Sequence, residues 1–264
     1  MINPNIITKI SKAEDISWAT VEKDYFLTML LEGIAQNPFL KKTFVFKGGT
    51  ALRKIYFENY RYSEDLDFTL RKTLTAQEIR DSLETVLQFL KTEHNAEFII
   101  NDFNSKSYFT DVKVRFIGLK KTKSIVSFDL SPSEIIVDEP FEKIVFNPYY
   151  EKEFTLPTYT LEEIVAEKLR SLLQRIRVRD YYDVWYLLTK NKDKLNEKRI
   201  KKIFLKKVEF KNINFTDKTE LLKTENLEQA KAYYNSQLGN QIKNLPSFDQ
   251  ISEELKQAIN TIEL

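Results

Sequence analysis

The chain has 264 residues, of which 42% are hydrophobic and 30% charged, and its formal net charge is +2. This composition is typical of a folded globular protein, and the near-neutral charge does not by itself indicate a nucleic-acid-binding protein. The absence of cysteine excludes disulfides and thiolate metal sites, and the single histidine, His94, cannot build a His-rich zinc site. No apolar run approaches the roughly 20 residues needed to cross a bilayer, and the start of the chain lacks a secretory pattern, so we expect a cytoplasmic protein with no membrane partner.

The first part of the chain predicts a helix and two strands around a glycine turn. Residues 16–35 carry apolar residues at helical spacing without a proline, and residues 44–46 form a short apolar run. Gly48 and Gly49 follow, and residues 51–57 again have a helical pattern. With a second strand over residues 66–70, the pattern predicts two strands that flank one crossover helix.

A helix and three more strands are expected next. Thr75 and Glu78 have the spacing of a capping box for a helix that runs to about residue 91. Three segments are rich in β-branched and aromatic residues, with a hairpin turn expected at Asn104-Ser105. These segments are residues 96–103, 107–116 and 124–130.

From Thr160 onward the apolar pattern becomes helical. Thr160 and Glu163 have capping-box spacing, and the apolar face of the helix is expected to run as far as Ile176. Further helical patterns cover residues 181–188, 197–206, 227–238 and 248–262. We therefore predict an α/β (α+β) fold, with a mixed-sheet lobe over residues 1–155 and a mainly helical lobe over residues 156–264.

Two aspartates stand out on the second predicted strand. Alternate residues of a strand point to the same face, so Asp65 and Asp67 are expected to project together. Their mutual repulsion is relieved by a cation, and carboxylate oxygens at a strand end suit Mg²⁺ better than Zn²⁺. The alternative is a pair of exposed acids on a solvent-facing strand.

The glycine turn gives the aspartate pair a context. Gly48 and Gly49 have no side chains, so backbone amides there can approach a phosphate at the start of a helix. The segment FKGGTALRKIYFENYRYSEDLDF, which combines this turn with Asp65 and Asp67, resembles the signature of the AbiEii/AbiGii toxin family. That family is a branch of the DNA polymerase β-like nucleotidyltransferases.

The resemblance implies a third carboxylate on a neighbouring strand. Asp129 is the one acid in the apolar run of residues 125–130 and is the candidate for this third metal ligand. The alternative is that Asp129 ends its strand and caps the turn before Pro132.

A second motif lies in the helical lobe. Helical periodicity places Lys168 within the apolar stripe, so its ammonium either extends past its neighbours to water or reaches the cleft between the lobes. Together with the segment Arg177 to Trp185, it resembles the second signature of the family. The resemblance implies that Lys168 contacts the nucleotide and that Asp180 supports the site, with Asp183 beside it. The alternative for Asp180 is an ordinary helix N-cap.

The family resemblance assigns further nucleotide-binding and supporting residues. The expected nucleotide-binding residues are Gly48, Gly49, Thr50, Ser63 and Lys168. The expected supporting residues are Lys47, Arg61, Arg179 and Asp183. A basic cluster is formed by Arg170, Arg175, Arg177 and Arg179. This cluster could bind phosphates, and the alternative is that it is only a solvated helical face.

The function implied is transfer of a nucleoside monophosphate from an NTP to an acceptor hydroxyl. Two Mg²⁺ ions are expected, with Asp65, Asp67 and Asp129 as ligands. The resemblance further implies the toxin of a type IV toxin–antitoxin or phage-defence (abortive-infection) system, with RNA, in some relatives tRNA, as the acceptor and a separately encoded antitoxin. Two alternatives stay open: nucleotidylation of a protein hydroxyl, and a non-catalytic regulator that binds NTP.

Overall fold

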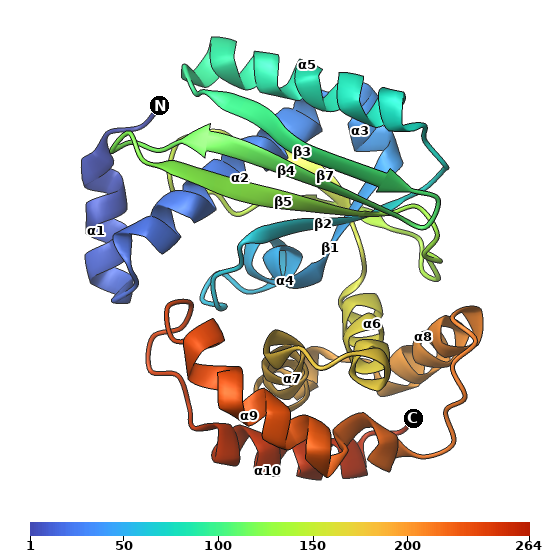
Figure 1. Ribbon diagram of the computed structural model, residues 1–264. Helices are drawn as coiled ribbons and strands as arrows, with labels where there is room; N and C mark the ends of the chain where they lie inside the picture. The colour runs from blue at the N-terminus through green and yellow to red at the C-terminus, as the bar shows by residue number, and fades with distance from the viewer. The chain divides into compact units, whose positions relative to one another are not determined.

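The chain divides into a unit built around a sheet and a unit built from helices. The computed structural model describes residues 1–264 (Figure 1). The sheet unit comprises residues 1–136 and 140–159, and the helical unit comprises residues 137–139 and 160–264. The backbone therefore passes between the units three times, and each unit has a core of its own.

The sheet unit contains one mixed seven-stranded sheet of order β3-β4-β5-β2-β1-β7-β6. The pairs β2/β5 and β1/β7 are parallel, and the other neighbours are antiparallel. The strands are β1 (Phe44–Lys47), β2 (Asp65–Leu70), β3 (Phe98–Lys106), β4 (Phe109–Ile117), β5 (Lys123–Ser131), β6 (Phe141–Ile144) and β7 (Thr155–Thr158). The helices are α1 (Pro4–Glu14), α2 (Trp18–Gln36), α3 (Pro38–Thr43), α4 (Gly48–Ala51), the π-helical turn η1 (Leu52–Tyr56) and α5 (Ala76–His94). The predicted α/β class is confirmed.

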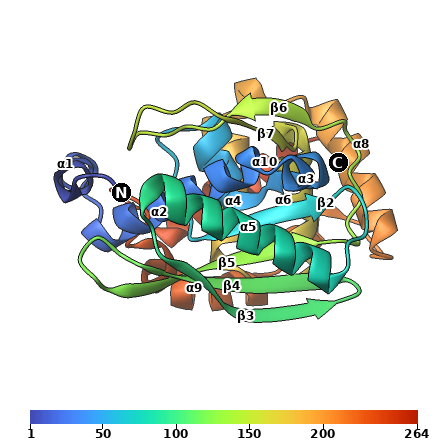
Figure 2. The ribbon, with the colours of Figure 1, turned by 90° about the horizontal axis from the view of Figure 1, so that it is seen from above.

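Helices α2 and α5 cover one face of the sheet (Figures 1 and 2). Along β4 and β5 every second residue is buried, because alternate side chains of a strand point to opposite faces. Phe26 of α2 stacks on Phe116 of β4 with ring centroids 4.1 Å apart. The other face of β4 and β5 is only half-buried, and we call it the open face.

Several local predictions for this unit are confirmed and two are wrong. The helix expected over residues 16–35 is α2, and Thr75 and Glu78 form both halves of the predicted capping box. The strands β1 and β2 pair antiparallel, so the helical segment between them is not a crossover. The hairpin turn lies at Ser107-Tyr108 instead of Asn104-Ser105, since Lys106 is paired with Phe109.

The helical unit follows the predicted order of helices. Its elements are α6 (Leu161–Gln174), α7 (Val178–Trp185), the π-helical turn η2 (Tyr186–Lys190), the 3₁₀ turn η3 (Lys192–Lys194), α8 (Glu197–Phe210), the 3₁₀ turn η4 (Lys218–Leu222), α9 (Thr224–Leu238) and α10 (Phe248–Thr261). None of the helices of the chain is both long and apolar enough to cross a membrane.

The start and end of α6 differ from the prediction. Thr160 caps the helix by accepting from the Glu163 amide, but the Glu163 carboxylate accepts instead from the amides of Val137 (2.9 Å) and Asp138 (3.0 Å). The expected capping box is therefore only half formed. Ile176 lies beyond the end of the helix and is 37% exposed, so it does not extend the apolar face.

Candidate functional site

The glycine turn lies directly against one of the predicted metal ligands. Strand β1 ends at Lys47, and Gly48 then adopts a φ of +79°, a conformation that side chains disfavour. A Cβ on Gly48 would lie 2.1 Å from the Oδ2 of Asp67, which is shorter than any non-bonded contact. Only glycine therefore lets the chain turn here while Asp67 keeps its place.

Three carboxylates share one face of the sheet in adjacent strands. Asp67 of β2 is paired with Asp129 of the parallel strand β5, and Asp129 is paired with Asp111 of β4. We call Asp67, Asp129 and Asp111 the acid row. Asp65 lies two residues before Asp67 and so points to the same face. The structure thus places the three predicted ligands on one face of two adjacent strands and adds Asp111, which the sequence did not single out.

The charges and donor atoms of this face suit a divalent cation. Like charges directly opposite one another on neighbouring strands destabilise a sheet, so the acid row is electrostatically unfavourable by itself. Lys47 of β1 is paired with Asp67 and supplies one positive charge at the end of the acid row. The oxygen donors of half-buried Asp65, Asp67 and Asp129 fit a hard ion such as Mg²⁺. No three acidic or histidine side chains are gathered in ion-binding geometry as they stand. Binding an ion would therefore involve rotation of these side chains.

Several residues that the sequence predicted for nucleotide binding or support lie at or beside the glycine turn. A Cβ on Gly49 would lie 2.8 Å from a terminal nitrogen of Arg61 and 3.1 Å from the Oγ of Ser63. The hydroxyl of Thr50 donates to the carbonyl oxygen of Asp65 at 2.5 Å. The turn is thus attached to the start of β2, and Arg61 and Ser63 lie beside it.

In the helical unit, Lys168 is held by two buried aspartates. Its ammonium lies 2.7 Å from Oδ1 of Asp180 and 2.8 Å from Oδ2 of Asp183, and Arg175 donates to Asp180 at 3.0 Å. Burial would raise the pKa of Asp180, but Lys168 and Arg175 outweigh it and hold that pKa below its usual value. Asp180 is not an N-cap, because α7 is preceded by Arg177 at that position.

The basic cluster near α7 is partly used in local structure. Arg175 pairs with Asp180, and Arg170 is buried and donates to the side chain of Gln174. Arg177 is exposed. The cluster is therefore not a uniform solvated face, and its proposed contact with phosphates stays a prediction.

The family model described as the nucleotidyl transferase AbiEii toxin of type IV toxin–antitoxin systems matches residues 30–254. The chain belongs to the AbiEii toxin family. It is therefore a nucleotidyltransferase, as the sequence predicted, and the family implies an NTP substrate and a separate antitoxin. The matched range contains all the candidate residues of both units.

Solved structures with a similar fold include two nucleotidyltransferase proteins. MenT4, a nucleotidyltransferase toxin from Mycobacterium tuberculosis H37Rv, has a TM-score of 0.73 and 16% identity, over 100% of this chain and 91% of that chain. A proposed nucleotidyltransferase from H. pylori has a TM-score of 0.58 and 17% identity, over 93% and 95% of the two chains. At these identities the likeness establishes the fold. No curated protein matches the sequence.

A buried ionic network of this AbiEii protein anchors the helical segment that follows the glycine turn. Lys54 of η1 lies 2.5 Å from Oδ2 of Asp24 on α2, and the Tyr149 hydroxyl donates to the same oxygen at 2.6 Å. Arg53 lies 3.6 Å from the other Asp24 oxygen, and its guanidinium lies over the ring of Tyr62. Burial would raise the pKa of Asp24, but Lys54 and Arg53 hold it below its usual value. The network fixes η1, and with it the turn, against α2.

A second buried carboxylate lies nearer the other end of α2. Glu32 accepts hydrogen bonds from Nε2 of His94 (3.0 Å) and from the hydroxyl of Tyr150 (2.7 Å), and it pairs with Lys152 at 2.5 Å. The one histidine of the chain is thus bound to a structural acid in the sheet unit.

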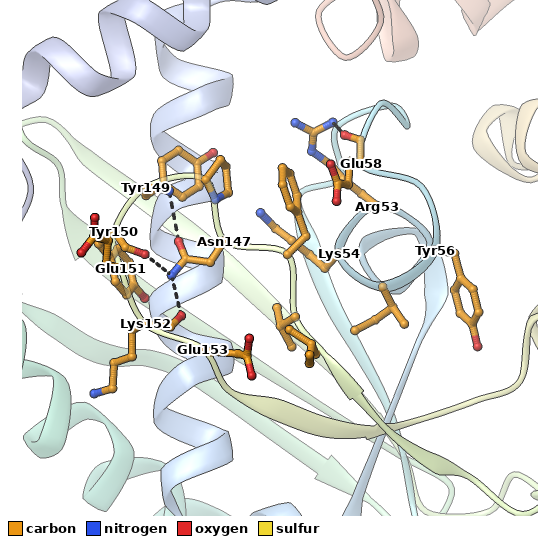
Figure 3. A pocket seen from close by; sticks show the side chains of 15 residues that line it. Arg53, Lys54, Tyr56, Glu58, Asn147, Tyr149, Tyr150, Glu151, Lys152 and Glu153 are labelled. Atoms are coloured by element: carbon orange, nitrogen blue, oxygen red, sulfur yellow. Dashed lines mark hydrogen bonds between the residues drawn. The ribbon is translucent and has the colours of Figure 1, made fainter.

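A cavity of about 810 Å³ lies between η1 and residues 144–153 (Figure 3). Asn147 fixes the shape of this loop, because its amide nitrogen donates to the backbone carbonyls of Tyr150 and Lys152 and its oxygen accepts from the Tyr149 amide. None of the predicted site residues lines the cavity. Cavity size therefore does not identify the site, and the acid row and the glycine turn do.

Proposed function

We propose that this AbiEii nucleotidyltransferase transfers a nucleoside monophosphate to a terminal hydroxyl of RNA, with tRNA as the expected acceptor. The acceptor oxygen forms a bond to the α-phosphorus of the NTP, the bond to the pyrophosphate oxygen breaks, and the hydroxyl proton leaves to water. The observation that supports this proposal most is the pairing of Asp67 with Asp129 on adjacent parallel strands, beside a turn that only glycine can make.

The roles follow from the positions on the sheet. Asp65 and Asp67 are proposed to hold Mg²⁺ with the nucleotide, and Asp129 to hold Mg²⁺ near the acceptor hydroxyl. Two such ions, when bound, would stabilise negative charge on the attacking oxygen and on the leaving pyrophosphate. The amides of Gly48 and Gly49 are proposed to bind the phosphates.

Polar and cationic side chains around the turn complete the proposed nucleotide site. Thr50 is proposed to hold the turn against β2 through its hydrogen bond to the Asp65 carbonyl, and Ser63 to offer a hydroxyl beside Gly49. Lys47 and Arg61 are proposed to supply positive charge near the turn. In this arrangement the protein contributes position and charge, which phosphoryl transfer needs more than acid–base groups. The scarcity of histidine is therefore no obstacle.

The residues of the helical unit keep the roles expected from the family signature as predictions. Lys168 is proposed to contact the nucleotide, Asp180 to position Lys168, and Arg179 and Asp183 to support them. The ion pairs of Lys168 with the two aspartates support a positioning role for these acids. The physiological role proposed is that of a toxin in abortive-infection defence, acting in the cytoplasm where NTPs and tRNA are found.

The test is incorporation of label from each NTP into total RNA or total protein, with Mg²⁺ present. We expect label in RNA and a loss of at least about 100-fold in the variant Asp67→Asn, since one metal-holding carboxylate is removed. The control is Glu142→Gln on β6, an exposed acid at the edge of the sheet opposite to β3, which should retain activity.

Each other outcome rejects a part of the proposal. Label in protein identifies the acceptor as a protein hydroxyl, and NTP binding without pyrophosphate release indicates a regulator. Wild-type turnover by a folded Asp67→Asn protein refutes the role of the acid row.

A further inference from the structure

A second cross-strand row lies on the open face of the sheet. Arg115 of β4 is paired with Ile99 of β3 on one side and with Ile125 of β5 on the other. Ile99 is 52% exposed and Ile125 is 39% exposed. We call Ile99, Arg115 and Ile125 the arginine row. It places one cation between two apolar side chains that the protein does not cover.

The guanidinium of Arg115 has no acid to neutralise it. Lys113, the nearest basic side chain on the same face of β4, lies 3.6 Å from Asp102, whereas the guanidinium of Arg115 has no carboxylate within 4.0 Å and no hydrogen bond to the protein. An arginine is a planar fork of donors that matches a phosphate and also stacks on flat rings. Arg115 is thus available for an anionic ligand on this face.

The arginine row lies in line with the acid row along the same strands. Ile125 precedes Asp129 by four residues of β5, which is about 13 Å at the usual strand rise. The intervening positions on this face are Ser127 and Lys113, which are paired with each other. A chain whose end lies at Asp129 can therefore follow β4 and β5 over the hydroxyl of Ser127 and the ion pair of Lys113 with Asp102 to Arg115.

We infer that this face binds the single-stranded 3′ end of the acceptor RNA. Arg115 binds a backbone phosphate, Ile99 and Ile125 contact an unpaired base, and the terminal hydroxyl lies at Asp129. The faces of unpaired bases are exposed, whereas the bases of a duplex are stacked on one another. A cation between two apolar side chains therefore suits a single strand, which offers a phosphate and the face of a base together. This inference rests on the proposed function for placing the 3′ end of the RNA at Asp129, but the binding of RNA can be tested without catalysis.

The experiment measures binding of a short labelled single-stranded RNA to full-length protein at several salt concentrations. Asp67→Asn is the background, so that no turnover occurs. The test variants are Arg115→Gln, which keeps a long polar side chain, and Arg115→Ala. The control is Lys143→Gln, which removes one exposed positive charge on β6 at the opposite edge of the sheet.

We expect both Arg115 variants to bind the RNA about tenfold or more weakly, while NTP binding and thermal unfolding stay unchanged. The slope of log affinity against log salt should fall by about 0.7, the value for one phosphate contact of a single strand. In the active enzyme Arg115→Gln should raise the KM for RNA and leave the KM for NTP unchanged.

Three results overturn the inference. They are equal binding by the Arg115 and Lys143 variants, equal affinity for duplex and single-stranded RNA, and no RNA binding by the parent protein. If RNA binds through Arg115 but label enters protein, the proposed acceptor is wrong and the RNA-binding face stands. If RNA is nucleotidylated but the Arg115 variants behave as the control, the function stands and the face is wrong.

Discussion

Replacing Gly48 by alanine tests whether the turn and the acid row depend on each other. A Cβ there would lie 2.1 Å from Asp67 Oδ2 and 2.8 Å from its Cβ, so the Asp67 side chain or the backbone has to move. The φ of +79° adds about 1–2 kcal/mol for any residue with a side chain. We expect the free energy of unfolding to fall by about 1–3 kcal/mol, and transfer activity to fall about 100-fold or more because Asp67 is displaced.

Gly49 is the matched control because it is the next residue of the same turn. Its added Cβ would lie 2.8 Å from the terminal nitrogen of Arg61, a milder approach than the 2.1 Å at Gly48, and its φ is not in the positive range. Gly49→Ala should therefore cost clearly less than Gly48→Ala in denaturant unfolding and in NTP incorporation. Wild-type stability and activity of Gly48→Ala, or equal effects of the two substitutions, would refute the contact between Gly48 and Asp67 as the reason for glycine.

Two further predictions concern the buried acids of α2. Asp24→Asn should lower the free energy of unfolding by about 3–5 kcal/mol, because Lys54 and Arg53 lose their buried counter-charge. The control Asp102→Asn changes an exposed acid and should cost less than about 1 kcal/mol. Equal urea unfolding midpoints for the two variants would contradict this prediction. Burial would raise the pKa of Glu32, but hydrogen bonds from a histidine, a lysine and a tyrosine lower it from 4.5 to about 2. Its charged form therefore stabilises the fold above about pH 4.5, and up to about 3 kcal/mol is lost as the pH falls towards 2. Urea unfolding across this range should show a flatter pH dependence in Glu32→Gln, and an unchanged slope would reject the assignment.

Local patterns predicted the elements that have a clear period. Strands β4 and β5 are recognisable because alternate residues of each are buried. The 19 residues of α2 are recognisable from their length and from many apolar residues without a proline, although residues 24–34 are buried on all sides of the helix. The four-residue strands β6 and β7 are too short for a period, and Pro157 lowers the strand signal further. Helices α1 and α3 are short and begin at prolines, which local composition assigns to turns as readily as to helix starts.

The sequence predicted which residues form the candidate site, but not which of them lie opposite one another in the sheet. Asp65 and Asp67 share a face because a strand has a period of two, which is a local property. The pairing of Asp67 with Asp129 joins positions far apart in the chain, and only the sheet register establishes it. The same register adds Asp111, an acid whose own segment carries no motif. The buried network around Asp24 was missed for the same reason, since its partners on η1 and at Tyr149 come together only in the folded chain.

Lys168 shows how a correct local observation can leave the role of a residue open. The helical period places this lysine among apolar residues, and a buried ammonium needs an acid or an exit to water. The structure supplies two acids, Asp180 and Asp183, which are themselves almost fully buried. Removing Lys168 would take one cationic partner from each of two buried carboxylates, so lost activity in Lys168→Ala would by itself not demonstrate contact with NTP. A rise in the KM for NTP at unchanged thermal stability is the result that would separate nucleotide binding from this structural ion pair.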